Sequence, residues 1–290
     1  MGGHLIGFRN VGRVCFCFIA ALLLLIRPAH AQTPSPLAEW QYSSGIQLQR
    51  LFEPTVPKWQ VELGLGTQFA PAADGLGVYS VQEGPAIDIR YKDIAFFSSG
   101  EGLGANLFSF RHISVGGAIT YDLGRSPHVD GAALNGLGTI HPAPELKFFA
   151  TTVLSESFPL TIRVDVRKQF GASFGYIGDA GAYLPMPGSS AKFAWFVGPT
   201  VTLADTRYMN TYFGISHTQA ISSHYHSYFK ARGGFKSAGL GLDADYFVTQ
   251  HILFNLSAAY DRLLGSAAES PITKDNPNEG VVSVSAIYKF

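Results

Sequence analysis

The stretch that decides the fold is VVSVSAIYKF, residues 281–290. Every second side chain is apolar and falls on one face of an extended strand: Val282, Val284, Ala286, Tyr288 and Phe290. The other face carries Ser283, Ser285 and Lys289, with Ile287 as the one exception. A repeat of two residues is the period of a β-strand, because successive side chains point to opposite faces. The stretch therefore predicts a terminal strand with an apolar face and a polar face.

The amino-terminal residues 1–31 are typical of a secretory signal peptide. Two arginines precede an apolar run of 13 residues (14–26), and Ala29 and Ala31 form a small-x-small cleavage site. The run is too short for a spanning helix, which needs about 20 residues, so an uncleaved anchor is disfavoured. We expect cleavage after Ala31, with Gln32 as the first mature residue.

The predicted mature chain contains no cysteine, because Cys15 and Cys17 both lie in the signal peptide. This excludes disulfides, thiol catalysis and thiolate metal sites. Removing residues 1–31 takes away three of the 21 basic residues and none of the 21 acidic ones, which leaves a net charge of −3. Such a balance predicts no nucleic-acid partner.

Alternation of apolar and polar side chains recurs along the mature chain, for example in WQVELGLGTQF (59–69) and LTIRVDV (160–166). No apolar run approaches 18 residues, so no helical span is expected. Only 14% of the residues are charged, against roughly 25% in ordinary globular domains. The predicted strands are long, and eleven residues tilted by about 45° rise about 26 Å, close to the apolar band of an outer-membrane barrel.

These features predict a transmembrane antiparallel β-barrel at residues 59–290, preceded by a periplasmic leader at residues 32–58. An open sheet edge in lipid leaves backbone groups unsatisfied, so the sheet must close. We expect about twelve strands, with ten or fourteen as alternatives. The predicted strands are 59–69, 86–92, 94–109, 112–123, 145–154, 160–169, 175–184, 191–203, 206–216, 238–248, 251–263 and 281–290.

An even strand number places both ends of the barrel on the periplasmic side. The short periplasmic turns are then expected at 92–93, 204–206 and 249–250. The longer outer loops are expected at 70–85, 217–237 and 264–280. Residues 124–144 do not fit this scheme, because they form a long connection on the predicted periplasmic side.

The terminal aromatic pair, Tyr288 and Phe290, resembles the carboxyl-terminal signal that the insertion machinery of bacterial outer-membrane proteins recognises. Further motifs extend the resemblance: WQVELGLG, GPAIDIRYKDIAFF, GEGLGANL, LNGLG, ADTRYMNTYFGISHTQAISS and YDRLLGSAAESPIT. In this order and spacing the chain from Trp59 to Phe290 resembles the MipA/OmpV family of MltA-interacting outer-membrane proteins. The resemblance implies a barrel of the cell outer membrane without catalytic chemistry. It also implies a scaffold that brings together a lytic transglycosylase and a murein synthase.

An outer-membrane enzyme is the main rival class. His112 and Ser114 share a face, but it is the inward one, whereas a surface phospholipase needs its nucleophile at the lipid-facing rim. Asp243 and Asp245 also share a face and have no histidine at a matching position. We expect no catalytic residues, and we interpret the two aspartates as part of a hydrogen-bond network in the lumen.

Two clusters are candidates for ligand or ion binding. His217, His224 and His226 fall in one predicted loop, where alternate histidines can share a metal ion, but no carboxylate accompanies them. We therefore predict neither a metal site nor a cofactor. The second cluster faces inward and either lines a selective pore or fills the lumen with ion pairs, the interpretation we favour. Its members are Asp88, Arg90, Arg163, Asp165 and Arg167.

Two function classes remain open: a scaffold for murein-processing enzymes, and a narrow small-solute channel or surface receptor or adhesin. The expected partners are outer-membrane lipid, the insertion machinery and, for a scaffold, a lytic transglycosylase and a murein synthase. Asn135, Leu137 and Ile140 make residues 124–144 the candidate partner segment, because exposed apolar side chains rimmed by polar ones often mark an interface.

Overall fold

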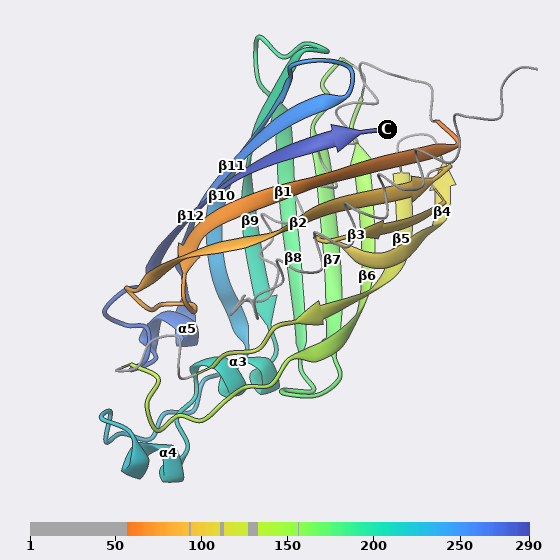
Figure 1. Cartoon of the computed structure of the whole chain (residues 1–290). Helices are drawn as coiled ribbons and strands as arrows, with labels where there is room; N and C mark the ends of the chain where they lie inside the picture. The colour runs from red at the N-terminus through yellow and green to blue at the C-terminus, as the bar shows by residue number, and fades with distance from the viewer. Residues whose placement is uncertain (1–56, 93, 111–112, 127–132, 156) are drawn as a thin grey trace, which may run out of the picture.

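The computed structural model describes residues 57–92, 94–110, 113–126, 133–155 and 157–290. These residues form a closed antiparallel barrel of twelve strands (Figure 1), which confirms the predicted fold class. The signal peptide, the cleavage residues Ala29, Ala31 and Gln32, and all of the leader except its last two residues lie outside the described residues.

Each strand pairs with the next along the chain, and the last strand closes the barrel against the first. The strands are β1 (Trp59–Pro71), β2 (Tyr79–Tyr91), β3 (Ala95–Ser98), β4 (Gly102–Phe110), β5 (Ile113–Asp122), β6 (Ala143–Val153), β7 (Thr161–Gln169), β8 (Tyr176–Pro185), β9 (Phe193–Ala204), β10 (Gly234–Phe247), β11 (Ile252–Leu263) and β12 (Asn278–Lys289). Among the described residues, three short helices lie between strands: α3 (Thr206–Phe213), α4 (His217–Ser222) and α5 (Gly265–Glu269). No described helix is long and apolar enough to cross a membrane.

The terminal strand has the two faces that its sequence predicts. Val282, Val284 and Tyr288 are each about half exposed on the outside of the barrel, whereas Ser283 and Ser285 are buried inside. The exception, Ile287, is also buried, because it packs in the lumen against Ala86 of β2 and Leu253 of β11. The apolar face therefore meets lipid and the polar face meets the interior.

Aromatic side chains mark both rims of the barrel, as interfacial girdles do. At one rim the rings of Trp59 and Tyr91 lie 4.8 Å apart, and at the other the rings of Phe69 and Tyr79 stack at 5.0 Å. The first rim is also the one where β12 ends, since Leu63 of β1 pairs with Tyr288.

The strand count of twelve is confirmed, but two of the predicted strands were wrong. The predicted strand 94–109 is two strands, β3 and β4, joined by a tight turn at residues 99–101. The Ser98 hydroxyl accepts hydrogen bonds from the backbone N–H groups of Gly100 and Glu101, at 3.1 and 3.0 Å, and Gly102 has a φ of +83°. Side-chain alternation on both sides of so short a turn hides the reversal.

The predicted strand 206–216 is instead helix α3. Asp205 caps the helix, because its carboxylate accepts a hydrogen bond from the Tyr208 N–H at 2.8 Å. Tyr208, Met209, Tyr212 and Phe213 are buried on one helix face, a spacing of one and four residues that belongs to the helical period. The sequence predicted one strand too few at β3 and β4 and one strand too many at α3. The two errors cancel, so the predicted total of twelve is still correct.

The added turn at 99–101 and the loss of strand 206–216 reverse the predicted direction of every strand between these two segments. The reversal explains why residues 124–144 are too long for a periplasmic turn. The ends of β4, β6, β8 and β10 meet the starts of the strands that follow them at the same end of the barrel as Lys92; we call it the short-turn end. The connections from β1 to β2, from β5 to β6, from β9 to β10 and from β11 to β12 leave and re-enter the barrel at the other end, the long-loop end (Figure 1). Residues 124–144 therefore lie with the long loops, and residues 204–206 do too, contrary to the predicted periplasmic placement of both segments.

Candidate functional site

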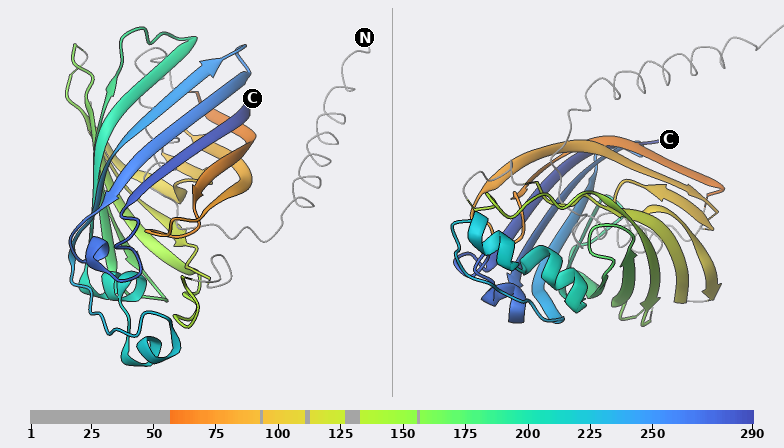
Figure 2. Two further views of the ribbon diagram at one scale, coloured as in Figure 1. Left: turned by 90° about the vertical axis from the view of Figure 1, so that its left-hand side faces the viewer. Right: turned by 90° about the horizontal axis from the view of Figure 1, so that it is seen from below.

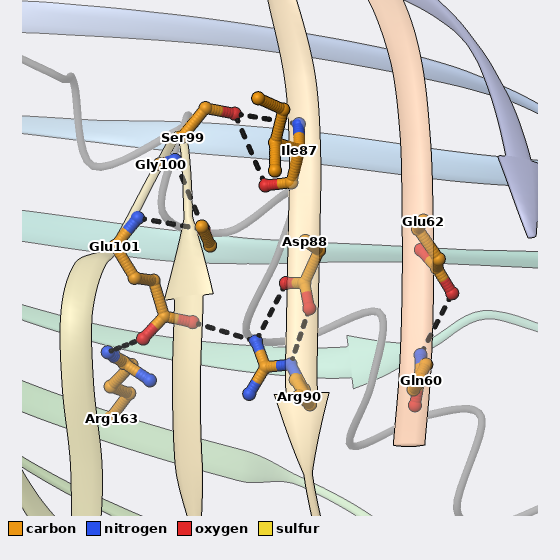
Figure 3. Close-up of polar contacts among 10 residues, drawn as sticks. Gln60, Glu62, Ile87, Asp88, Arg90, Ser99, Gly100, Glu101 and Arg163 are labelled. Atoms are coloured by element: carbon orange, nitrogen blue, oxygen red, sulfur yellow. Dashed lines mark hydrogen bonds and ion pairs between the residues drawn. The ribbon is translucent and has the colours of Figure 1, made fainter. Parts of the chain in front are cut away.

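The first polar cluster of the lumen lies around the turn between β3 and β4 (Figure 3). The Arg90 guanidinium donates to both Asp88 oxygens, with Nε–Oδ1 at 2.9 Å and Nη2–Oδ2 at 3.0 Å. The Glu101 carboxylate accepts from Arg90 Nη2 at 3.3 Å and from Arg163 Nη2 of β7 at 3.0 Å. All four side chains are buried, so one carboxylate from a turn joins two arginines from different strands.

Two phenylalanines complete this cluster. The Arg90 guanidinium carbon lies 5.3 Å from the centre of the Phe96 ring, and that of Arg163 lies 4.7 Å from the Phe149 ring. Such cation–π contacts strengthen when the groups are shielded from water. The turn geometry that aims Glu101 inward is thus the local feature on which the cluster depends.

A second cluster lies on β7, β8 and β9. Arg167 forms an ion pair with Asp179 and lies 3.5 Å (Nε–Oδ1) from Asp165, and Thr202 donates a hydrogen bond to Asp179. The sequence prediction that Asp88, Arg90, Arg163, Asp165 and Arg167 face inward is confirmed. It missed Glu101 and Asp179, because strand register, not sequence spacing, brings these two carboxylates to the arginines.

The next strands along the wall, β10 and β11, carry the aspartate pair. Asn255 Nδ2 of β11 donates to Asp243 at 2.7 Å and to Asp245 at 2.8 Å, and the Ser257 hydroxyl donates to Asp243 at 2.8 Å. This is the predicted hydrogen-bond network of the lumen, and no histidine belongs to it among the described residues. His112, which the sequence analysis rejected as a catalytic partner of Ser114, lies outside the described residues.

The long-loop end is covered by a packed layer that we call the cap, residues 72–78, 133–140, 205–233 and 264–277. Figure 2 shows its helices gathered at this end of the barrel. Two apolar clusters hold it together, one around Met209 and Phe213 and the other around Leu134 and Ile215. Tyr225 and Ser222 also donate hydrogen bonds to backbone carbonyls of residues 133 and 136, each at 2.9 Å.

The candidate partner segment is part of this cap, and its exposure differs from the prediction. Leu137 is only 4% exposed in the second apolar cluster, and Ile140 packs half-buried against the first. Of the three residues, Asn135 alone is exposed. Leu137 and Ile140 therefore stabilise the cap and are not the free apolar surface that the sequence predicted.

Asp122 at the end of β5 joins the cap to the barrel. Its buried carboxylate accepts hydrogen bonds from the Gly124 N–H at 2.6 Å, Gln169 Nε2 at 2.7 Å and the Tyr212 hydroxyl of α3 at 2.6 Å. Burial and then the charge of Asp122 raise the pKa of the Tyr212 phenol well above its usual value, so the phenol keeps its proton and donates.

We expect Asp122→Asn to loosen the cap, because the new amide nitrogen faces a donor. Leaving a buried polar group without its partner costs about 1–3 kcal/mol. Limited proteolysis of residues 205–233 should be faster in this variant, with the barrel itself intact. Asp275→Asn, an exposed change at the same end, is the control and should leave the rate unchanged. Equal rates in both variants would contradict this role of Asp122.

The three loop histidines do not gather around one point. The His217 ring stacks on Tyr228 at 4.2 Å between centroids, and His224 packs against Tyr225 at 4.0 Å. The described residues include no group of three or more histidine, aspartate or glutamate side chains that could hold a metal ion.

With the geometry in place, comparison with known proteins gives the family. Residues 63–290 match the family model described as MltA-interacting protein MipA. The chain belongs to the MipA family. This confirms the resemblance read from the sequence, and the MipA-family barrel is a protein of the outer membrane.

No curated protein matches the chain. Solved structures similar to it include the translocator domain of the autotransporter NalP from Neisseria meningitidis, at 13% identity and a TM-score of 0.43, covering 87% of this chain and 98% of that one. The COG4313 outer membrane channel from Pseudomonas putida F1 is similar at 9% identity and a TM-score of 0.42, covering 81% and 97%. At these identities and scores no functional argument follows from the likeness.

Proposed function

We propose that this MipA-family barrel is a non-enzymatic scaffold that holds a lytic transglycosylase and a murein synthase at the outer membrane. The family description, MltA-interacting protein, supports a protein partner. The observation that carries the proposal is the filled interior. Lys147 and Arg167 are 0% and 2% exposed inside the barrel, and ion pairs through Glu101 link β2 to β7, strands that are not neighbours.

A filled interior favours a scaffold over a channel. Conduction requires a continuous polar path from one mouth to the other. Here the long-loop mouth is covered by the cap, and the lumen charges Asp88, Arg90 and Glu101 are paired with one another instead of facing an open path. A barrel built in this way offers its outer surfaces to partners more readily than its interior to solutes.

The partner surface belongs at the short-turn end. In outer-membrane barrels the short turns face the periplasm, where murein-processing enzymes work. β1 begins at this end with Trp59, so the leader joins the barrel here. Residues 124–144 lie at the opposite end, and we therefore place the contact in residues 32–58 and the short turns.

The proposal predicts which deletion abolishes capture. Removing residues 32–56 should weaken binding of a purified lytic transglycosylase and murein synthase by about tenfold or more, about 1.4 kcal/mol. The matched control changes the exposed cap residues Asn135 and Thr139 to Arg, which should leave binding unchanged. Loss of binding in the cap variant alone, or no binding by the intact protein, would contradict the proposal.

A surface receptor or adhesin is a second candidate, and one observation favours it. The cap carries Ile221 on α4 with 83% of its surface exposed, next to the stacked pair His217 and Tyr228. An apolar side chain together with two exposed rings forms a patch, and exposed patches are the features that mark interaction sites.

A further inference from the structure

The barrel wall is incomplete beside β2. β2 pairs with β1 along its whole length, from Tyr79 to Tyr91, but with β3 only from Asp88 to Tyr91. The last contact on that side is between Ile87 and Ser99, whose backbone N–H donates to the Ile87 carbonyl at 2.9 Å. Within the described part of the chain, residues 79–86 have no strand partner on their second side, because β3 is four residues long and β2 thirteen (Figure 1).

The far side of this opening is β5. β4 accompanies β5 only as far as the pair Leu103–Ile119, and residues 120–122 of β5 pair with β6 alone among the described strands. We call the region between residues 79–86 and 120–122, above the turn at 99–101, the wall opening. It lies in the half of the wall nearer the long-loop end, because β2 and β5 both reach that end.

The exposed edge presents more hydrogen-bond acceptors than donors. In an antiparallel ladder every second residue bonds to the same neighbour, and Ile87 bonds toward β3. The backbone groups of Tyr79, Val81, Glu83 and Pro85 therefore point into the wall opening. Pro85 has no N–H, so these residues offer four carbonyls but only three N–H groups, and the Glu83 carboxylate adds a further acceptor.

Proline at this position also argues against a partner strand. Prolines and charged side chains are devices that protect sheet edges from further strand pairing. Yet unsatisfied backbone groups at the lipid boundary are costly, so the edge needs a hydrogen-bonding partner that is not a strand. A donor-rich polar group meets this need.

The surroundings suit the head group of a lipid. Outside, Val81, Leu103 and Ile119 are each 60% or more exposed and continue the lipid-facing surface up to the opening. Inside, a side chain at Gly84 would meet nothing within 4 Å, whereas exposed Glu83 and Pro85 lie on the same outward face as Val81. An apolar outer lip beside an open, polar edge matches a molecule with an acyl chain and a polar head.

We propose that the wall opening is a lateral binding site for a membrane lipid whose head group is rich in hydrogen-bond donors. The acyl chains stay along Val81 and Ile119, and the head group donates to the free carbonyls and to Glu83. The site is separate from the partner surface of the scaffold and does not depend on it.

Two lipid probes with the same charge but a different number of head-group donors test the site. Phosphatidylethanolamine carries an ammonium group with three donors, and phosphatidylcholine carries none. A bimane fluorophore is attached at Gln82→Cys in the otherwise cysteine-free mature protein, in nanodiscs containing either lipid with a nitroxide near the head of its chain. Thr200→Cys, on β9 where both neighbouring strands pair with it, is the control position.

We expect the ethanolamine probe to quench the fluorophore at residue 82 about fivefold more effectively than the choline probe, the factor expected for one net hydrogen bond. Neither probe should quench at residue 200, and Gly84→Trp, which fills the open space, should abolish the difference. Equal quenching by both lipids, or none, overturns the proposal. Quenching that appears only after residues 32–56 are deleted also overturns it, because the leader would then occupy the edge.

Discussion

Replacing Glu101 with Gln is expected to lower the free energy of unfolding by about 3–5 kcal/mol, the range measured when one partner of a buried ion pair is removed. Glu101 is 1% exposed, and its carboxylate accepts hydrogen bonds from both Arg90 and Arg163. The amide keeps the size of the side chain but removes the charge that both guanidinium groups share. Urea unfolding of the refolded barrel, followed by tryptophan fluorescence, measures the difference.

Two further variants show whether the charge is responsible. Glu83→Gln makes the same change at an exposed position of the neighbouring wall and should alter stability by no more than about 0.5 kcal/mol. Adding Arg163→Met to Glu101→Gln should recover part of the loss, because it removes one of the two uncompensated charges. A Glu101→Gln barrel as stable as the wild type would show that the cluster does not hold the wall together.

The barrel itself could be predicted from the sequence, because alternation reports directly on which face of a strand meets lipid. Val282 and Val284 are exposed and Ser283 and Ser285 buried, as the period of two requires. The signal is local and survives without knowledge of the neighbouring strands. It carries no information about where a chain reverses within three residues, so the turn at 99–101 was missed.

The prediction of a strand in place of helix α3 failed for a different reason. The segment TRYMNTYF contains enough aromatic residues to suggest a strand, but Tyr208, Met209, Tyr212 and Phe213 follow the helical period. Asp205 was the signal that could have identified the helix. It is a typical N-cap residue, and its carboxylate binds the N–H of Tyr208 three residues later. Together with the missed turn at 99–101, this error reversed the strands between the two segments and moved residues 124–144 to the wrong end.

The functional site could be predicted only in part. Inward-facing arginines follow from strand parity, which placed Arg90, Arg163 and Arg167 correctly. The partners of these arginines cannot be predicted from strand parity. Arg163 binds Glu101, which is 62 residues away in the sequence, because the barrel brings the two segments together. The wall opening was equally hidden, since it results from the difference in length between β2 and β3, and strand ends are the least certain part of any sequence interpretation.

The central claim is that the interior of this barrel is filled and the protein acts through its surfaces. Conductance in a planar lipid bilayer tests it most directly. The purified, refolded wild-type protein is inserted, and insertion is verified by its heat-modifiable migration in gels. Because buried ion pairs fill the lumen and the cap covers the long-loop end, we predict no steady conductance at any applied voltage that the bilayer tolerates. Steady, reproducible conductance steps from the intact protein would contradict the claim and establish a channel instead.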